Sequence, residues 1–237
     1  MLQGILYIVS TPIGNLKDIT LRAIEVLKNC DIIVCEDSRR ASLLIKNFVN
    51  EKKKYIVYHD HNKEKVAPLI IKKLKEGFNI ALTTDAGTPI ISDPGFYLVR
   101  QSIKENIEIT SVPGPSSILA ALVVSGLPPD RWIFEGYIKK RKGRRKKQIE
   151  KLKNEERTII FFESPFRIVD TLHEIKEILG NRRISLCREL TKFHEEVIRG
   201  TIEDVMELLS RREKIKGEIV LIVEGLTKDE KKNKRAP

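Results

Sequence analysis

The first half of the chain alternates short apolar runs with longer amphipathic segments, and this alternation limits the possible folds more than any other feature. The apolar runs occupy residues 5–9, 31–35, 55–58, 79–83 and 107–112, and apolar residues at helical spacing lie between them. The runs are apolar throughout rather than at every second residue, which is typical of parallel strands covered on both faces. We therefore predict an α/β domain built on a mostly parallel five-stranded sheet.

A polar or turn-rich cluster follows each of these runs. The clusters lie at residues 10–15, 36–40, 59–62, 83–95 and 113–117. Because the carboxyl ends of parallel strands lie along one edge of a sheet, all five clusters are predicted to share that edge. Open α/β sheets bind their ligands there, so we expect this edge to be the active side.

The cluster at residues 83–95 is the most unusual of the five. Two glycines and two prolines fall within nine of its residues, from Gly87 to Gly95. The glycines permit backbone angles or close approaches that a Cβ atom would block, and the prolines fix φ and remove donors. We interpret the segment as a stiff ligand-binding loop, with an elaborate turn between a strand and a helix as the alternative.

The second half of the chain has a different texture after the turn at residues 126–129. Strand-like runs at 131–138, 157–163, 184–190, 194–200 and 217–223, with helical segments between them, predict a second α/β domain with a mixed sheet. We expect an N-terminal domain at 1–129, a C-terminal domain at 130–227 and a basic flexible tail at 228–237. The tail is too polar to fold alone. A basic insertion at 139–151 is predicted as a surface loop that runs into a helix near Gln148.

The net charge of +11 is concentrated in two segments. Residues 139–151 hold nine Lys or Arg against one Glu, a net +8, and residues 228–237 hold five against two acids, a net +3. Charge gathered in this way indicates a polyanionic partner, most often a nucleic acid. A solvated linker and tail kept apart by repulsion is the alternative, and for the tail it is equally favoured.

The absence of long apolar runs and the cysteine content limit the class of protein. No run approaches the roughly 18 apolar residues that would span a membrane, and the start of the chain lacks the charged and apolar regions of a signal peptide. The three cysteines, Cys30, Cys35 and Cys187, have no metal-like spacing and suit a reducing cytosol. A cytoplasmic protein is therefore expected.

Several common sites are missing from the sequence. It contains no phosphate-binding G-x-x-x-x-G-K-[ST] motif and no G-x-G-x-x-G after the first strand. His59, Asp60 and His61 could hold a metal, but no fourth ligand is evident, so we expect no metal. A hydrogen-bonding role beside the active edge, or a purely structural one, remains open for these histidines.

The polar clusters resemble those of the tetrapyrrole-methylase superfamily of S-adenosylmethionine-dependent methyltransferases. The residues that carry the resemblance are Ser10-Thr11-Pro12-Ile13-Gly14-Asn15, Glu36-Asp37-Ser38-Arg39, Thr84-Asp85-Ala86-Gly87-Thr88-Pro89, Asp93-Pro94-Gly95 and Val112-Pro113-Gly114-Pro115-Ser116-Ser117. The resemblance spans residues 4–226. It implies two α/β domains with the cofactor in the cleft between them, and a homodimer.

Within this superfamily the chain is most similar to the enzymes that 2′-O-methylate a cytidine in the decoding region of 16S rRNA, in the small ribosomal subunit. That closer likeness lies in His59-Asp60-His61-Asn62, Arg188-Glu189-Leu190-Thr191-Lys192, Arg199-Gly200, Lys216-Gly217-Glu218 and Glu224-Gly225. The resemblance also implies which residues bind the cofactor, with Asp85 suited to the methionine amino group. These residues are Pro12, Asp85, Gly87, Thr88, Pro89, Ser117, Ile118 and Glu163. Asp85 could instead cap a turn.

Transfer of a methyl group to a 2′-oxygen requires alignment of that oxygen and a base for its proton. The candidate bases, all expected at the active edge, are Glu36, Asp37, His61, Asp93, Glu163 and Glu189. The residues expected to hold RNA phosphates are Arg39, Arg144, Arg145, Lys146, Lys147, Arg167 and Arg188.

Three aromatic residues before the basic insertion, Trp132, Phe134 and Tyr137, would either stack on bases or pack in the core. Two other functions stay open at this point. One is a small-molecule methylase of the same fold, and the other is a non-catalytic RNA-binding protein.

Overall fold

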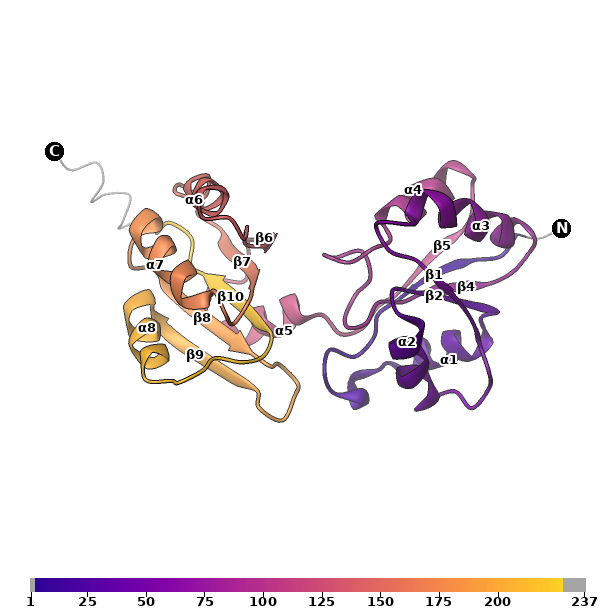
Figure 1. Ribbon diagram of the computed structural model, residues 1–237, viewed down its shortest axis with the longest axis horizontal. Coiled ribbons are helices and arrows are strands. Elements are labelled where there is room, and N and C mark those ends of the chain that lie inside the picture. The colour runs from indigo at the N-terminus through magenta and orange to yellow at the C-terminus, as the bar shows by residue number, and fades with distance from the viewer. Residues whose placement is uncertain (1–2, 228–237) are drawn as a thin grey trace. The chain divides into compact units, whose positions relative to one another are not determined.

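A computed structural model of the chain describes residues 3–227 and divides into two compact units after Ser116 (Figure 1). The sequence predicted the domain boundary after residue 129, which is 13 residues beyond the division after Ser116. The reason is the helix α5 (Ser117–Ser125), which contacts the second sheet and shares a core with it through Ile118, Ala121 and Leu122. The basic tail expected at 228–237 lies outside the described residues.

The first unit contains a parallel sheet in the order β3-β2-β4-β1-β5. This confirms the parallel five-stranded sheet predicted from the apolar runs. Its strands are β1 (Leu6–Val9), β2 (Ile32–Cys35), β3 (Lys54–Val57), β4 (Ile80–Leu82) and β5 (Ile109–Val112). Its helices are the short 3₁₀ helix η1 (Leu16–Asp18), α1 (Leu21–Asn29), α2 (Ser38–Lys46), α3 (Lys63–Lys75) and α4 (Phe96–Lys104).

Helices cover both faces of this sheet, which explains why its strands are apolar throughout. Residues of α1 and α2 share a core with Val9, Ile33 and Ala81. Residues of α3 and α4 share another core with strand residues of the opposite parity, such as Ile8 and Leu82. Figure 1 shows α1 and α2 on one side of the sheet and α3 and α4 on the other.

The second unit contains a mixed sheet in the order β6-β7-β10-β8-β9. β6 pairs with β7 in parallel, and the remaining neighbours are antiparallel. The sheet is therefore mixed, as the sequence predicted. Its strands are β6 (Trp132–Tyr137), β7 (Thr158–Glu163), β8 (Arg183–Arg188), β9 (Glu196–Thr201) and β10 (Ile219–Val223). Besides α5, its helices are α6 (Lys142–Glu150), α7 (Ile168–Leu179) and α8 (Ile202–Ser210).

Side chains alternate across the second sheet and build two cores. Phe161, Leu186 and Leu221 face the core made with α6, α7 and α8. Their neighbours in sequence, among them Ile160 and Val220, face the core made with α5. Strand alternation thus places α6, α7 and α8 on one face of the sheet and α5 on the other.

The basic insertion is more regular than the sequence indicated. Most of it forms the helix α6, whereas a surface loop leading into a helix near Gln148 was expected. The helix forms because Arg145 and Ile149, one turn apart, are buried against the second unit, so packing overrides the repulsion between its cations. Within the described part of the chain, no helix has the length and apolar character needed to cross a membrane.

Candidate functional site

Three loops at the carboxyl edge of the first sheet are tied together by hydrogen bonds. Thr11, after β1, exchanges backbone hydrogen bonds of 2.9 and 3.0 Å with Gly87, after β4. The Thr11 hydroxyl also donates to the carbonyl of Thr84 at 3.1 Å. The Thr88 hydroxyl lies 3.1 Å from that of Ser10 and donates to the carbonyl of Pro115, after β5, at 3.2 Å. The ends of three neighbouring strands therefore form one cross-linked edge.

The topology places a switch point at this edge. β1 and β4 are neighbours in the sheet, but β1 leads to α1 on one face and β4 leads to α4 on the other. Open α/β sheets usually bind their ligands at such a switch point. The cluster at residues 83–95 follows β4 and therefore lies at this position.

The backbone of that cluster is strained, as a functional loop often is. Ile90 and Ser92 have φ angles of 79° and 67° although neither is glycine. At Gly95, with φ of 141°, a Cβ atom would come within 2.7 Å of Ile90 Cγ1 and 2.9 Å of Leu82 Cδ2. The loop therefore depends on glycine at this position and packs tightly against the end of β4.

Asp85 has one oxygen engaged and one without a partner. Its Oδ2 accepts a hydrogen bond from Arg40 Nη1 at 2.9 Å. Its Oδ1 is buried and has no hydrogen-bond partner among the described residues. Because an unpaired buried oxygen is costly, this atom is suited to accept from a donor on a ligand. Arg40 was not singled out from the sequence, since a pairing across 45 residues leaves no local signal.

The structure brings together five of the eight residues expected at the cofactor. Pro12, Gly87 and Pro89 are buried, and Asp85 and Thr88 are half-buried in the same cross-linked loops. The other three, Ser117, Ile118 and Glu163, belong to the second unit. Ser117 begins α5, and Ile118 is buried in the core between α5 and the second sheet.

Glu163, the third of these, is buried at the end of β7 and fully engaged. Its Oε2 accepts from the Thr171 hydroxyl at 2.7 Å, and its Oε1 accepts from the Ser164 amide and from Arg167. These bonds fix the turn after β7. They also occupy Arg167, one of the expected phosphate ligands.

Two of the candidate bases, Asp37 and Glu189, are held as ions. The guanidinium and backbone amide of Arg39 donate to Asp37, which caps α2, and lower the pKa of this carboxyl to about 2. The Glu218 amide and the Lys192 ammonium donate to Glu189 at 2.9 Å, and these bonds lower its pKa. Carboxylates with low pKa values are weak proton acceptors at neutral pH.

Another candidate base at the active edge, Asp93, has a raised pKa. Burial raises the pKa of Asp93 to about 6, and the negative charges of Glu36 and Asp85 add to this effect. Asp93 follows the strained Ser92 in the loop after β4. Glu36 and His61, two further candidate bases, are both exposed.

The expected phosphate ligands of α6 divide into two kinds. Arg145 is buried and donates to both oxygens of Glu174, at 2.6 and 2.8 Å. Lys146 pairs with Glu177. Arg144 and Lys147 are exposed and form no ion pair within the described chain. Elsewhere Arg39 is exposed but pairs with Asp37, and Arg188 pairs with Glu196.

Of the three aromatic residues before the basic insertion, Phe134 packs against a core of the second unit. The rings of Phe134 and Tyr137 lie 4.9 and 5.3 Å from that of Phe162, edge to face. Trp132 and Tyr137 remain partly exposed. In the first unit, the rings of His59 and His61 lie 5.9 Å apart. No group of three His, Cys, Asp or Glu residues in the described chain is arranged to hold a metal ion.

Comparison with known proteins gives one family and many similar sequences. Residues 5–206 match the model of the tetrapyrrole (corrin/porphyrin) methylases. The chain is 46% identical over 238 residues to the ribosomal RNA small subunit methyltransferase I of Haemophilus influenzae, covering 100% of this chain and 84% of the relative. It is 42% identical to the protein of the same name from Thermotoga maritima, covering 94% of this chain and 99% of the relative.

Solved structures share the fold at much lower identity. Diphthine synthase superposes with a TM-score of 0.68 at 13% identity, covering 94% of this chain and 91% of the other. Cobalt precorrin-4 methyltransferase superposes with a TM-score of 0.63 at 18% identity, covering 93% and 94%.

Proposed function

Because the chain belongs to the family of tetrapyrrole (corrin/porphyrin) methylases, we propose that it is an S-adenosylmethionine-dependent methyltransferase acting on the RNA of the small ribosomal subunit. The observation that carries the RNA substrate is the 46% identity over the full chain to a protein named for that activity. From the sequence resemblance we further propose the 2′-oxygen of a cytidine in the decoding region of 16S rRNA as the methyl acceptor.

The residues of the cross-linked edge fit the cofactor. The orphaned Oδ1 of Asp85 is placed to accept from an ammonium group, while Arg40 holds the other oxygen and fixes the carboxylate. Gly87, with φ of 85°, lets the backbone of the loop approach a ligand closely. S-adenosylmethionine, when bound, supplies a methyl group on a sulfonium, which is already a reactive donor. Ser117 and Ile118 are proposed as further cofactor residues from the second unit.

The chain itself must supply alignment of the acceptor and a place for its proton. We propose Asp93 as the proton acceptor, ahead of Glu36 and His61. A carboxyl with a pKa of about 6 is ionised at neutral pH yet remains more basic than an ordinary aspartate. Asp37 and Glu189 are less suited, since hydrogen bonds already stabilise their charged forms.

The free cations of α6 are proposed to bind the RNA backbone. Arg144 and Lys147 are exposed and without ion-pair partners in the described chain, as a phosphate contact requires. Arg145 is proposed to be structural, because its guanidinium is buried against Glu174. From the resemblance we also propose that the protein is a homodimer, and from its substrate that it acts in the cytosol.

A labelled-methyl experiment tests this function directly. The protein is offered S-adenosylmethionine labelled on its methyl group together with small subunits lacking native modification, naked 16S rRNA, or a tetrapyrrole precursor. We expect the label to enter the RNA and one phosphodiester to become resistant to alkali. The resistance arises because a methylated 2′-oxygen cannot attack the adjacent phosphodiester. Comparison of subunits with naked RNA identifies the form of the substrate.

Two other results would each replace the proposal. Label only in the tetrapyrrole precursor would indicate a small-molecule methylase of the same fold. Binding of RNA without binding of the cofactor would indicate a non-catalytic RNA-binding protein.

A further inference from the structure

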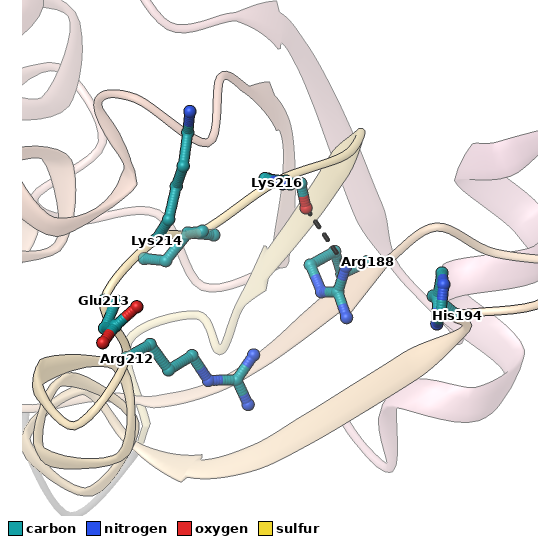
Figure 2. A pocket seen from close by; sticks show the side chains of 7 residues that line it. Arg188, His194, Arg212, Glu213, Lys214 and Lys216 are labelled. Atoms are coloured by element: carbon teal, nitrogen blue, oxygen red, sulfur yellow. Dashed lines mark hydrogen bonds between the residues drawn. The ribbon is translucent and has the colours of Figure 1, made fainter.

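A basic pocket of about 520 Å³ lies in the second unit, beside the turn from β8 to β9 and the connection from α8 to β10 (Figure 2). Four of its seven lining residues are Lys or Arg and one is acidic, so it favours an anion. Lys214 and Lys216 are exposed and have no ion-pair partner within residues 3–227. We refer to it below as the basic pocket.

Glu196 fixes the two arginines of the basic pocket. It accepts from Arg188 Nε at 3.1 Å and from both terminal nitrogens of Arg212, at 2.8 and 2.5 Å. Arg188 Nη1 also donates to the carbonyl of Lys216 at 3.1 Å, as drawn in Figure 2. Two guanidinium groups share one carboxylate, so positive charge remains, and Arg188 Nη2 has no hydrogen bond to another described residue. The arginines are therefore ordered before any ligand binds.

An aromatic ring stands next to the basic pocket. Phe193 lies in the β8–β9 turn (residues 189–195) and its side chain is 96% exposed. Its ring centroid is 5.0 Å from that of His194, which lines the basic pocket. An apolar side chain this exposed contributes almost nothing to the core of the second unit.

The β8–β9 turn is held in a costly conformation that presents this ring. Glu189 and Thr191 have φ angles of 52° and 66°. The Lys192 ammonium bridges Glu189 and Glu218 at 2.9 Å each, and the Thr191 amide donates to Glu195 at 2.5 Å. Strained backbone persists only where the surroundings impose it, and it is often part of a functional site. A pre-ordered turn loses little entropy when a ligand binds.

We propose that the β8–β9 turn and the basic pocket together bind one unpaired nucleotide of an RNA strand, with its base stacked on Phe193 and its phosphate held by Arg188, Lys214 and Lys216. Exposed aromatic rings beside cationic grooves are the usual way in which single-stranded RNA is held. The proposal rests on the function proposed above, and it adds a substrate-binding site distant in sequence from the cations of α6.

Two sets of substitutions separate the stacking and charge contributions. Phe193→Ala removes the ring, and Phe193→Tyr retains it. Lys214→Ala combined with Lys216→Ala removes two charges from the basic pocket. Leu208→Ala, on the exposed face of α8, and Lys153→Ala are the matched apolar and cationic controls. Because each of these side chains is exposed, circular dichroism should be unchanged in every variant.

The full-length chain is titrated with a fluorescent single-stranded oligoribonucleotide, and with polyphosphate as a base-free competitor. Phe193→Ala should weaken RNA binding roughly tenfold and leave polyphosphate binding unchanged, and Phe193→Tyr should restore wild-type affinity. The lysine double variant should weaken the binding of both ligands. It should also reduce the salt slope of RNA binding by about 0.7 for each phosphate that the protein no longer neutralises. Both control variants should match the wild type.

Unchanged RNA affinity in Phe193→Ala, with methyl transfer to RNA intact in the wild type, would overturn this inference and leave the proposed function standing. A wild-type chain that neither binds nor methylates RNA would overturn both. Sedimentation velocity provides a further check. If Phe193→Ala alters the oligomeric state without altering RNA affinity, the turn is a protein interface and the inference is wrong.

Discussion

The buried pair Arg145–Glu174 gives the sharpest test of how the basic segment is used. Both side chains are only 7% exposed, and the guanidinium donates to both carboxylate oxygens, at 2.6 and 2.8 Å. Glu174→Gln preserves the shape of the side chain but leaves the Arg145 charge buried without a counter-ion. Removing one partner of such a pair costs about 3–5 kcal/mol. For a chain of this size, that corresponds to a fall in melting temperature on the order of 10 °C.

Urea and thermal unfolding of the full chain measure this loss of stability. RNA binding is measured on the same variants, to separate the structural role of Arg145 from the binding role proposed for Arg144. Arg144→Ala, one residue away and exposed, should leave the free energy of unfolding within about 0.5 kcal/mol of the wild type while weakening RNA binding. Arg145→Met combined with Glu174→Leu should recover most of the lost stability, because neither charge is then left unpaired.

The pH dependence of stability has a definite sign. The hydrogen bonds from Arg145 lower the pKa of Glu174 in the folded protein. Its contribution is therefore present above the unfolded pKa of about 4.3 and is lost as the pH falls through the lower folded value. A loss below about 1 kcal/mol in Glu174→Gln at pH 7 would refute the buried pairing.

Three further predictions concern the first unit and the second sheet. Asp85→Asn should weaken S-adenosylmethionine binding at least tenfold, as measured by calorimetry, and should leave the fold intact. The reason is that the orphaned oxygen no longer belongs to an anion. Unchanged affinity would show that Asp85 does not bind the cofactor. The wild-type transfer rate should fall as the pH drops through about 6, and Asp93→Asn should abolish that inflection. Because the Asp93 pKa is raised, its charge opposes folding above that pH, so Asp93→Asn should be slightly more stable at pH 8 and lose this advantage in acid. Thr201→Ala should cost about 1 kcal/mol in urea unfolding, because it removes the capping box that Thr201 and Asp204 form at the start of α8.

Most of the fold could be predicted from periodicity. Apolar runs mark strands whose two faces are both covered, and the segments between them carry helical spacing, so strand type and order of elements follow from local pattern. The prediction was weaker where packing outweighed composition. α6 begins inside the basic insertion because Ile149 and the Arg145–Glu174 pair anchor it, and α5 belongs to the second unit because Ile118 and Leu122 pack on that sheet.

The candidate site also combines features that local sequence predicts with features that packing decides. The position of the loop after β4 was predictable, because Gly87, Pro89 and Gly95 carry a local conformational signal. The burial and hydrogen-bond partners of the carboxylates in this loop could not be predicted. Whether an aspartate is paired, buried or orphaned depends on neighbours that are distant in sequence, as Arg40 is from Asp85. The same holds for Arg145, which charge alone grouped with the cations expected to bind RNA.

Local sequence pattern is enough to predict the two α/β units, the edge that carries the polar loops and the family resemblance. These properties depend on short-range hydrophobic spacing and on residue types at set positions along the chain. Which charges remain available for a ligand depends instead on contacts between residues distant in the chain. The tertiary structure engages Arg145 with Glu174, leaves Asp85 Oδ1 without a partner and presents Phe193 beside the basic pocket. The energy of an ionic or polar side chain depends on its burial and its partners, and both are set by contacts between distant parts of the chain.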